Sequence, residues 1–321
     1  RLIPPTFDTE TLNATSVKLD MPVVAGNRPF ITVNATVGGG PSVPLLVDTG
    51  SPGVRIFADK VGANGVVATQ TPVDVTFADG TRFAGVEASA PVTFGGLETK
   101  GPINVQLITA VSCADGKPDC AGSVGIAKFT QTQAFSGILG IGMQAFDIYS
   151  PISQLQGGSP RSFSIAANSS VGSATMTFNT QPPAPQAAFR IPQWTDPQLA
   201  NGYPAWASNQ VQACWAYRGQ STSCVPTAFD TGSPTLFTDG SVPGAPKSTG
   251  PVPPGTPLSL SAEAGGPSIW SLTAGSTPGK NTVQVAPLEG GTSVNSGISI
   301  FRSRLVTFDL KNGNIFVSQA D

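Results

Sequence analysis

Histidine is absent from this 321-residue sequence, and that absence excludes whole classes of catalysis. Ser-His-Asp and Cys-His nucleophiles need an imidazole base, and the usual zinc sites need imidazole ligands. Hydrolysis by this chain would therefore have to depend on carboxylates, on lysine or on Ser-Lys pairs.

Charged residues are also scarce, at 11% of the sequence, and the formal net charge is only −2. Such a chain lacks the basic excess that attracts nucleic acids and anionic membranes, so we expect neither as a partner. No stretch of the sequence approaches the ~20 consecutive apolar residues of a membrane-spanning helix, so we expect no membrane span.

Cysteine is limited to four residues that form two pairs close in sequence, Cys113 with Cys120 and Cys214 with Cys224. The alternative to disulfides is zinc, but the spacing is too wide for a zinc knuckle and no histidine is available. We therefore predict two short disulfides and an oxidising, secreted or extracytoplasmic location.

Glycine and proline, by contrast, are abundant, with 37 and 30 residues. Apolar residues are spread evenly between the resulting turns, and the segment 30–37 alternates apolar and polar side chains. These features predict an all-β protein, and its length is sufficient for two lobes with a large core.

The chain is organised around a five-residue sequence that occurs twice, Asp-Thr-Gly-Ser-Pro at 48–52 and again at 230–234. Each copy follows a short apolar run and precedes another, which is typical of a turn between buried strands. One such triplet is ordinary turn chemistry, but the repeat indicates two lobes that each supply one carboxylate.

This pair of turns resembles those of the pepsin-type aspartic proteases, in particular divergent secreted bacterial members. The segment 135–142 is similar to the apolar-apolar-Gly segment behind the first aspartate, and 297–301 is a looser counterpart in the second lobe. The segment 305–317 is similar to the C-terminal hairpin of the family. The resemblance implies an all-β, bilobal fold with short helices.

A proline-rich stretch at 180–186 marks the expected lobe boundary. We predict an N-terminal lobe at 1–181, with the first turn and a flap, and a C-terminal lobe at 182–321. One helix is predicted between Ser150, as its cap, and Gly157, because Pro151 occupies its first position.

The resemblance implies that Asp48 and Asp230 are the catalytic pair and share one proton. The supporting residues follow each aspartate. The threonines would link the two turns, the glycines would allow backbone N–H groups to approach, and the serines would donate to the outer carboxylate oxygens: Thr49, Gly50, Ser51, Thr231, Gly232 and Ser233.

A hairpin around Asp79-Gly80 is the expected flap over the substrate, with Phe77, Ala78, Asp79 and Gly80 at its tip. Phe77 stands where the family usually has Tyr, and Arg55 stands where it usually has Trp. In the family the Trp ring N–H donates to the Tyr hydroxyl. Phe77 has no hydroxyl, so that hydrogen bond cannot form here. One hypothesis is that the Arg55 guanidinium covers the Phe77 ring; the alternative is that Arg55 points to solvent and Phe77 simply packs its apolar ring.

The sequence therefore predicts a monomeric aspartic endopeptidase that acts on peptides or proteins and needs neither a cofactor nor a metal. Two alternatives remain: a pepsin-fold binding or inhibitor protein with a silent pair, and an all-β protein whose Asp-Thr-Gly turns are only turns. In the last case the two aspartates would lie far apart.

Overall fold

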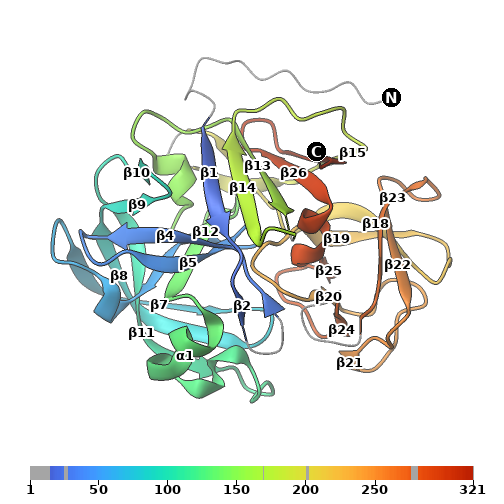
Figure 1. The fold of residues 1–321 in the computed structure, drawn as a ribbon, viewed down its shortest axis with the longest axis horizontal. Helices are drawn as coiled ribbons and strands as arrows, with labels where there is room; N and C mark the ends of the chain where they lie inside the picture. The colour runs from blue at the N-terminus through green and yellow to red at the C-terminus, as the bar shows by residue number, and fades with distance from the viewer. Residues whose placement is uncertain (1–14, 25–27, 169, 200–201, 276–280, 321) are drawn as a thin grey trace.

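A computed structural model describes residues 15–24, 28–168, 170–199, 202–275 and 281–320. Strands dominate this part of the chain, as the turn-rich sequence predicts (Figure 1). None of the helices in these residues is long and apolar enough to cross a membrane.

The larger of two main sheets has fifteen strands and contains the first Asp-Thr-Gly turn. In spatial order its strands are β15 (Ala187–Arg190), β27 (Asn314–Gln319), β26 (Arg304–Asp309), β13 (Ser162–Asn168), β14 (Ser173–Phe178), β1 (Ser16–Asp20), β4 (Thr32–Val37), β5 (Val43–Asp48), β12 (Gly137–Ile141), β6 (Pro52–Phe57), β11 (Ile103–Cys113), β8 (Thr81–Ala90) and β7 (Val67–Thr76), with β9 (Val92–Phe94) and β10 (Leu97–Glu98) as a branch from β4.

The second main sheet has eight strands. The second Asp-Thr-Gly turn connects two of these strands along the chain. Its order is β21 (Gly250–Pro251), β24 (Val283–Val285), β20 (Leu236–Thr238), β25 (Val294–Asn295), β19 (Ser223–Ala228), β18 (Val211–Tyr217), β22 (Pro257–Ser261) and β23 (Ser268–Thr273). Two hairpins stand apart from both sheets, β2 (Val23–Val24) with β3 (Arg28–Pro29), and β16 (Gln193–Gln198) with β17 (Pro204–Trp206).

Helices are short. The α-helix α1 spans Ile126–Gln133, and the 3-10 turns span Ala58–Lys60, Ala121–Val124, Pro151–Gln154 and Ile298–Arg302. The helix predicted between Ser150 and Gly157 is only the third of these turns, although the Ser150 hydroxyl does accept from the Ile152 N–H at 3.3 Å. Helix α1 is not predicted from the sequence, because its N-cap is Gly125, which offers no capping side chain.

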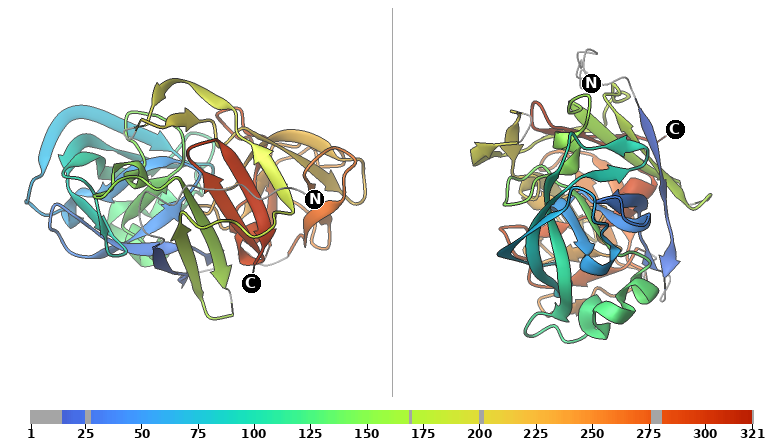
Figure 2. Two further views of the ribbon diagram at one scale, coloured as in Figure 1. Left: turned by 90° about the horizontal axis from the view of Figure 1, so that it is seen from above. Right: turned by 90° about the vertical axis from the view of Figure 1, so that its left-hand side faces the viewer.

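The two halves of the chain share one sheet at their junction. Strands β26 and β27 come from the end of the described chain, yet β26 pairs with β13, with Ser162 opposite Asp309. Figure 2 shows this late hairpin, in red, between the blue-green and orange halves of the molecule. Both sheets contribute to one hydrophobic core, so the turns are supported from behind by a common interior.

Phe308 on β26 lies at the centre of this junction, with 1% of its surface exposed. Its ring stacks on that of Phe163 at 4.8 Å and faces that of Phe301 at 6.4 Å. We expect Phe308→Ala to lower the free energy of unfolding by about 3–5 kcal/mol, the usual loss for a buried Phe. Chemical denaturation measures this change.

The matched control is Phe146→Ala, because Phe146 is 51% exposed and its ring packs edge-on against Trp194, which is itself only partly buried. Its substitution should cost less than about 1 kcal/mol. Equal losses for the two variants would show that the junction is not a principal source of stability.

Candidate active site

Each Asp-Thr-Gly turn follows a strand that is buried between two neighbours. Asp48 ends β5, which runs parallel to β12 and places Gly140 opposite Asp48. Asp230 follows β19, which runs parallel to β25 and places Asn295 opposite Ala228. The partner strands fix the ends of β5 and β19, so each aspartate has a rigid position at the start of its turn.

Threonine hydroxyls join the two turns across the interface between the halves of the chain. The Thr49 hydroxyl donates to the Phe229 carbonyl at 2.7 Å and accepts from the Thr231 N–H at 3.0 Å. The Thr231 hydroxyl donates to the Val47 carbonyl at 2.7 Å and accepts from the Thr49 N–H at 3.1 Å. All four groups are buried, so these bonds hold the turns at a fixed separation.

Glycine is required in both turns because each turn lies against the aspartate of the other. A Cβ on Gly50 would lie 2.7 Å from the Asp230 carboxyl carbon, and one on Gly232 would lie 2.6 Å from Asp48 Oδ1. Each glycine N–H also donates to the aspartate of its own turn at 2.7 Å. The turns therefore bring the two carboxyl groups together rather than leaving them far apart.

The outer oxygens of the two carboxyl groups are held by different side chains. The Ser51 hydroxyl donates to Asp48 Oδ2 at 2.5 Å. The Ser233 hydroxyl instead donates to the Thr235 carbonyl at 2.6 Å, and Asp230 Oδ2 accepts from Asn295 Nδ2 at 2.7 Å. The sequence does not indicate a role for Asn295, and Ser233 does not make the predicted bond to the outer oxygen of Asp230.

The carboxyl groups interact strongly because both are buried, with 4% of Asp48 and 8% of Asp230 exposed. Burial raises the pKa of Asp48 well above 3.8, and the negative charge of Asp230 and a hydrogen bond between the two carboxyls raise it further. The Ser51 and Gly50 bonds oppose this shift. Asp48 therefore retains a proton at pH values where an exposed carboxyl is ionised.

These features can be compared with known proteins. A model of the family described as PE-PGRS C-terminal aspartyl peptidase-like domain matches residues 16–314. The chain belongs to this family. No curated protein matches this sequence.

Among solved structures, the aspartic proteinase from Irpex lacteus has a similar fold, with a TM-score of 0.60 over 96% of this chain and 98% of that chain. The two sequences are 16% identical, so the similarity concerns the fold alone. It confirms that this aspartyl peptidase-like domain has the pepsin-type, all-β fold that the repeated turns predicted.

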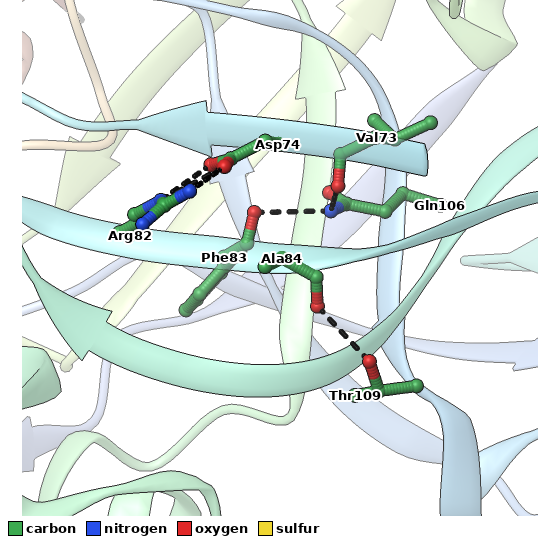
Figure 3. Close-up of polar contacts among 7 residues, drawn as sticks. All are labelled: Val73, Asp74, Arg82, Phe83, Ala84, Gln106 and Thr109. Carbon is green, nitrogen blue, oxygen red and sulfur yellow. Dashed lines mark hydrogen bonds and ion pairs between the residues drawn. The ribbon is translucent and has the colours of Figure 1, made fainter. Parts of the chain in front are cut away.

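In this aspartyl peptidase-like domain, β7 and β8 form the hairpin predicted as the flap, here called the flap hairpin (67–90). Gln106 on β11 is fully buried beneath it. Figure 3 shows that the Gln106 amide nitrogen donates to both strands, to the Val73 carbonyl at 2.9 Å and the Phe83 carbonyl at 3.1 Å. Gln106 therefore holds the inner side of the hairpin, a role that the sequence alone does not indicate.

Arg55 on β6 supports Gln106 from the side of the first Asp-Thr-Gly turn. Arg55 Nη1 donates to Gln106 Oε1 at 2.8 Å, and the side chain is buried, with 5% exposed. Burial lowers the pKa of Arg55 to about 10, while the negative charge of Asp48 opposes that shift. The attraction is mutual, but at Asp48 burial and the Asp230 charge outweigh it.

The Phe77 ring packs edge-on against the Phe83 ring at 5.2 Å. Arg55 does not stack on Phe77, and both residues lie in the described part of the chain. The Arg55 guanidinium bonds to Gln106 and the Phe77 ring packs on Phe83, so the stacking hypothesis is dropped. The alternative is wrong for Arg55, because its side chain is buried and not exposed to solvent, but its expectation that the Phe77 ring packs is met by the Phe83 contact.

The tip of the flap hairpin is bound to the loop that the first disulfide closes. Both predicted disulfides are present, Cys113–Cys120 and Cys214–Cys224. Four hydrogen bonds connect the first disulfide loop and the turn after it to the tip: Ala114 N–H to the Gly80 carbonyl at 2.8 Å, Lys117 Nζ to the Ala78 carbonyl at 2.8 Å, Ala121 N–H to Asp79 Oδ2 at 3.1 Å, and Gly122 N–H to Thr81 Oγ1 at 3.1 Å.

Removal of the first disulfide should therefore loosen the flap tip. In a double Cys113→Ser, Cys120→Ser variant, we expect the amides of residues 77–83 to exchange about tenfold faster, the factor that corresponds to 1.4 kcal/mol of local opening. Hydrogen exchange measured by mass spectrometry gives this rate. The control is Cys214→Ser, Cys224→Ser, which opens the other disulfide and should leave exchange at 77–83 unchanged.

The raised pKa of Asp48 predicts a pH-dependent change in stability. The folded protein holds this proton more tightly than the unfolded chain, whose ordinary value is 3.8. The protonated Asp48 therefore contributes its full stabilisation below the unfolded pKa, and this contribution is lost as the pH rises through the pKa of Asp48 in the folded protein. Relative to wild type, Asp48→Asn should gain stability as the pH rises from about 4 to about 7.

Urea denaturation across that range measures the difference. Asp74→Asn is the control of opposite sign, because the hydrogen bond from Arg82 lowers the pKa of Asp74. In the wild type, the ionised Asp74 contributes stability above its pKa in the unfolded chain, and this contribution is lost as the pH falls through its pKa in the folded protein. A difference for Asp48→Asn that does not vary with pH would contradict the protonation of Asp48.

Proposed function

We propose that this chain is an aspartic endopeptidase that cleaves peptide bonds with a water activated by Asp48 and Asp230. The observation that carries the proposal is the pair of buried, hydrogen-bonded carboxyl groups supplied by two equivalent turns. A turn that serves only as a turn does not need a glycine pressed against the other aspartate. The family match and the pepsin-type fold support the same function.

In the proposed reaction one carboxyl group is protonated and the other is ionised. The ionised carboxylate takes a proton from water as the water oxygen bonds to the peptide carbonyl carbon. The protonated carboxyl donates to the carbonyl oxygen as negative charge develops there. The carbon–nitrogen bond then breaks as the leaving nitrogen takes the proton that the first carboxyl received from water. A hydroxyl of the tetrahedral intermediate returns its proton to the second carboxyl, which restores the pair without a cofactor.

The substrate would be an extended peptide or protein segment covered by the flap hairpin, with Phe77 and its neighbours at the tip. We propose residues 1–181 and 182–321 as the two lobes, and a monomer as the active form. The two disulfides support a secreted or extracytoplasmic location, because such bonds persist in oxidising compartments.

Cleavage of an unfolded protein substrate at acid pH tests this function directly. We expect turnover in the wild type, inhibition by a statine-containing peptide, and a loss of about a thousandfold or more in Asp48→Asn and in Asp230→Asn. Activity should fall as the pH rises and both carboxyls ionise. The control is Asp239→Asn, an exposed carboxyl in the same half of the chain, which should keep wild-type turnover.

Retention of turnover in Asp230→Asn would exclude the carboxyl pair as the catalyst. Tight binding of the statine peptide without any cleavage would favour the alternative of a silent pepsin-fold binding protein.

A further inference from the structure

The strand pairing identifies the true counterpart of the apolar-apolar-Gly segment in the second half of the chain. Ile138 lies opposite Leu46, two residues before Asp48. Asn295 lies opposite Ala228, two residues before Asp230. The equivalent of Ile138-Leu139-Gly140 is therefore Asn295-Ser296-Gly297. The segment 297–301 that the sequence suggested starts at the correct glycine but continues into a 3-10 turn, and it omits the two polar residues.

Both polar residues of this counterpart contact Asp230. Asn295 Nδ2 donates to Asp230 Oδ2 at 2.7 Å, and the Ser296 hydroxyl accepts from the Asp230 N–H at 3.1 Å. In the first half of the chain, the equivalent positions hold Ile138 and Leu139, which are buried apolar side chains. The two aspartates therefore differ in their supporting strands, although their turns are identical in sequence.

The orientation of the Asn295 amide is fixed by its surroundings. Asn295 Oδ1 accepts from the Gly297 N–H at 2.9 Å, so this side of the amide must be the oxygen. The other side is then the nitrogen, which is a donor only, and it faces Asp230 Oδ2. With 7% of Asn295 exposed, water has little access to this contact.

A donor-only partner favours one charge state of a carboxyl. Both carboxyls accept from the N–H of their own glycine at 2.7 Å, so these two bonds do not distinguish them. The Asn295 amide N–H is the additional fixed donor at Asp230, and it stabilises the ionised form. The partner of Asp48 is the Ser51 hydroxyl, which can rotate and either donate or accept, and so tolerates a protonated Asp48. The surroundings of the pair are therefore unequal with respect to the shared proton.

We propose that Asn295 is a positioning residue that keeps Asp230 as the ionised member of the pair and leaves the shared proton on Asp48. This assignment rests on the proposed function and deepens it. Asp230 is then the group that takes the proton from water, and Asp48 is the group that donates to the peptide carbonyl. The buried Arg55 guanidinium lies on the Asp48 side and favours an ionised Asp48, so it acts against this assignment. The proposal therefore requires that the Asn295 bond to Asp230 outweigh the Arg55 charge.

The test is the pH dependence of kcat/KM in Asn295→Leu, which keeps the side-chain size and removes the donor. The acid limb reports protonation of the ionised carboxylate, so its midpoint should move up by about one pH unit, the effect of losing one charge-assisted hydrogen bond. The alkaline limb should stay within about 0.3 of a pH unit, because its proton leaves Asp48. A purely structural role would scale the whole profile down without moving either limb.

Asn295→Asp gives a second, independent readout. At the acid edge the new carboxyl is protonated and donates in place of the amide, so kcat/KM should stay closer to wild type than in Asn295→Leu. As the pH rises the new carboxyl ionises, and its negative charge raises the pKa values of the pair, so the alkaline limb should move to higher pH than in wild type. This variant also preserves an acceptor for the Gly297 N–H, so it tests the proposal if Asn295→Leu does not fold.

Two further variants complete the experiment. Thr282→Val removes the hydroxyl contact of Thr282 with Thr235 in the same half of the chain, and it should leave both limbs unchanged. Ser233→Ala distinguishes the two candidate supports of Asp230. An acid limb that moves in Ser233→Ala but not in Asn295→Leu would overturn the proposal.

A measurement without substrate separates this proposal from the proposed function. The carboxyl-carbon NMR signals of Asp48 and Asp230, assigned with Asp48→Asn and Asp230→Asn, titrate whether or not the protein cleaves peptides. A shift of about one pH unit in the first titration step of Asn295→Leu supports the assignment even for a protein without turnover. An unchanged titration in an active protein refutes the role of Asn295 and leaves the peptidase function intact.

Discussion

The reciprocal bonds of Thr49 and Thr231 are the interaction on which the rest of the site depends. Each hydroxyl donates to a carbonyl of the opposite turn and accepts an N–H from it, so neither turn has its full set of bonds alone. This contact brings Gly50 against Asp230 and Gly232 against Asp48. The interaction between the carboxyl groups, and the raised pKa of Asp48, follow from that approach.

Around this symmetric contact the two halves differ in what surrounds each aspartate. The first half supports its strand with apolar residues and leaves Asp48 to Ser51. The second half replaces the apolar pair with Asn295 and Ser296, and Ser233 contacts its own turn instead. Two identical five-residue turns can thus hold chemically different carboxyl groups, because the difference lies in the strand behind them.

The repeated turn, the all-β class and the disulfide pairs were predictable because each leaves a local signal in the sequence. The two Asp-Thr-Gly-Ser-Pro copies and the closely spaced cysteines need no knowledge of distant contacts. Asn295 and Gln106 were not predictable in this way. Their roles depend on strand register between segments far apart in sequence, and a lone amide in an apolar strand does not indicate which carboxyl or carbonyl it meets.

Arg55 illustrates the same limit for a charged side chain. A lone arginine suggested either stacking on Phe77 or exposure to solvent, and both interpretations assumed that a guanidinium stays near the surface. The structure buries it beneath the flap hairpin with Gln106 as its partner. The pairing of β6 with β11 decides this, because it places Arg55 opposite Gln106.

The shared sheet at the junction also constrains the order in which the molecule assembles during synthesis. Strand β13 needs β26 as a neighbour, and the Ser162–Asp309 pairing spans nearly half of the chain. A growing chain that has already made both Asp-Thr-Gly turns still lacks the strand that completes this sheet. The ribosome must therefore release the segment around 304–309 before the junction can close, so completion of this sheet is a late event that follows folding of the local hairpins.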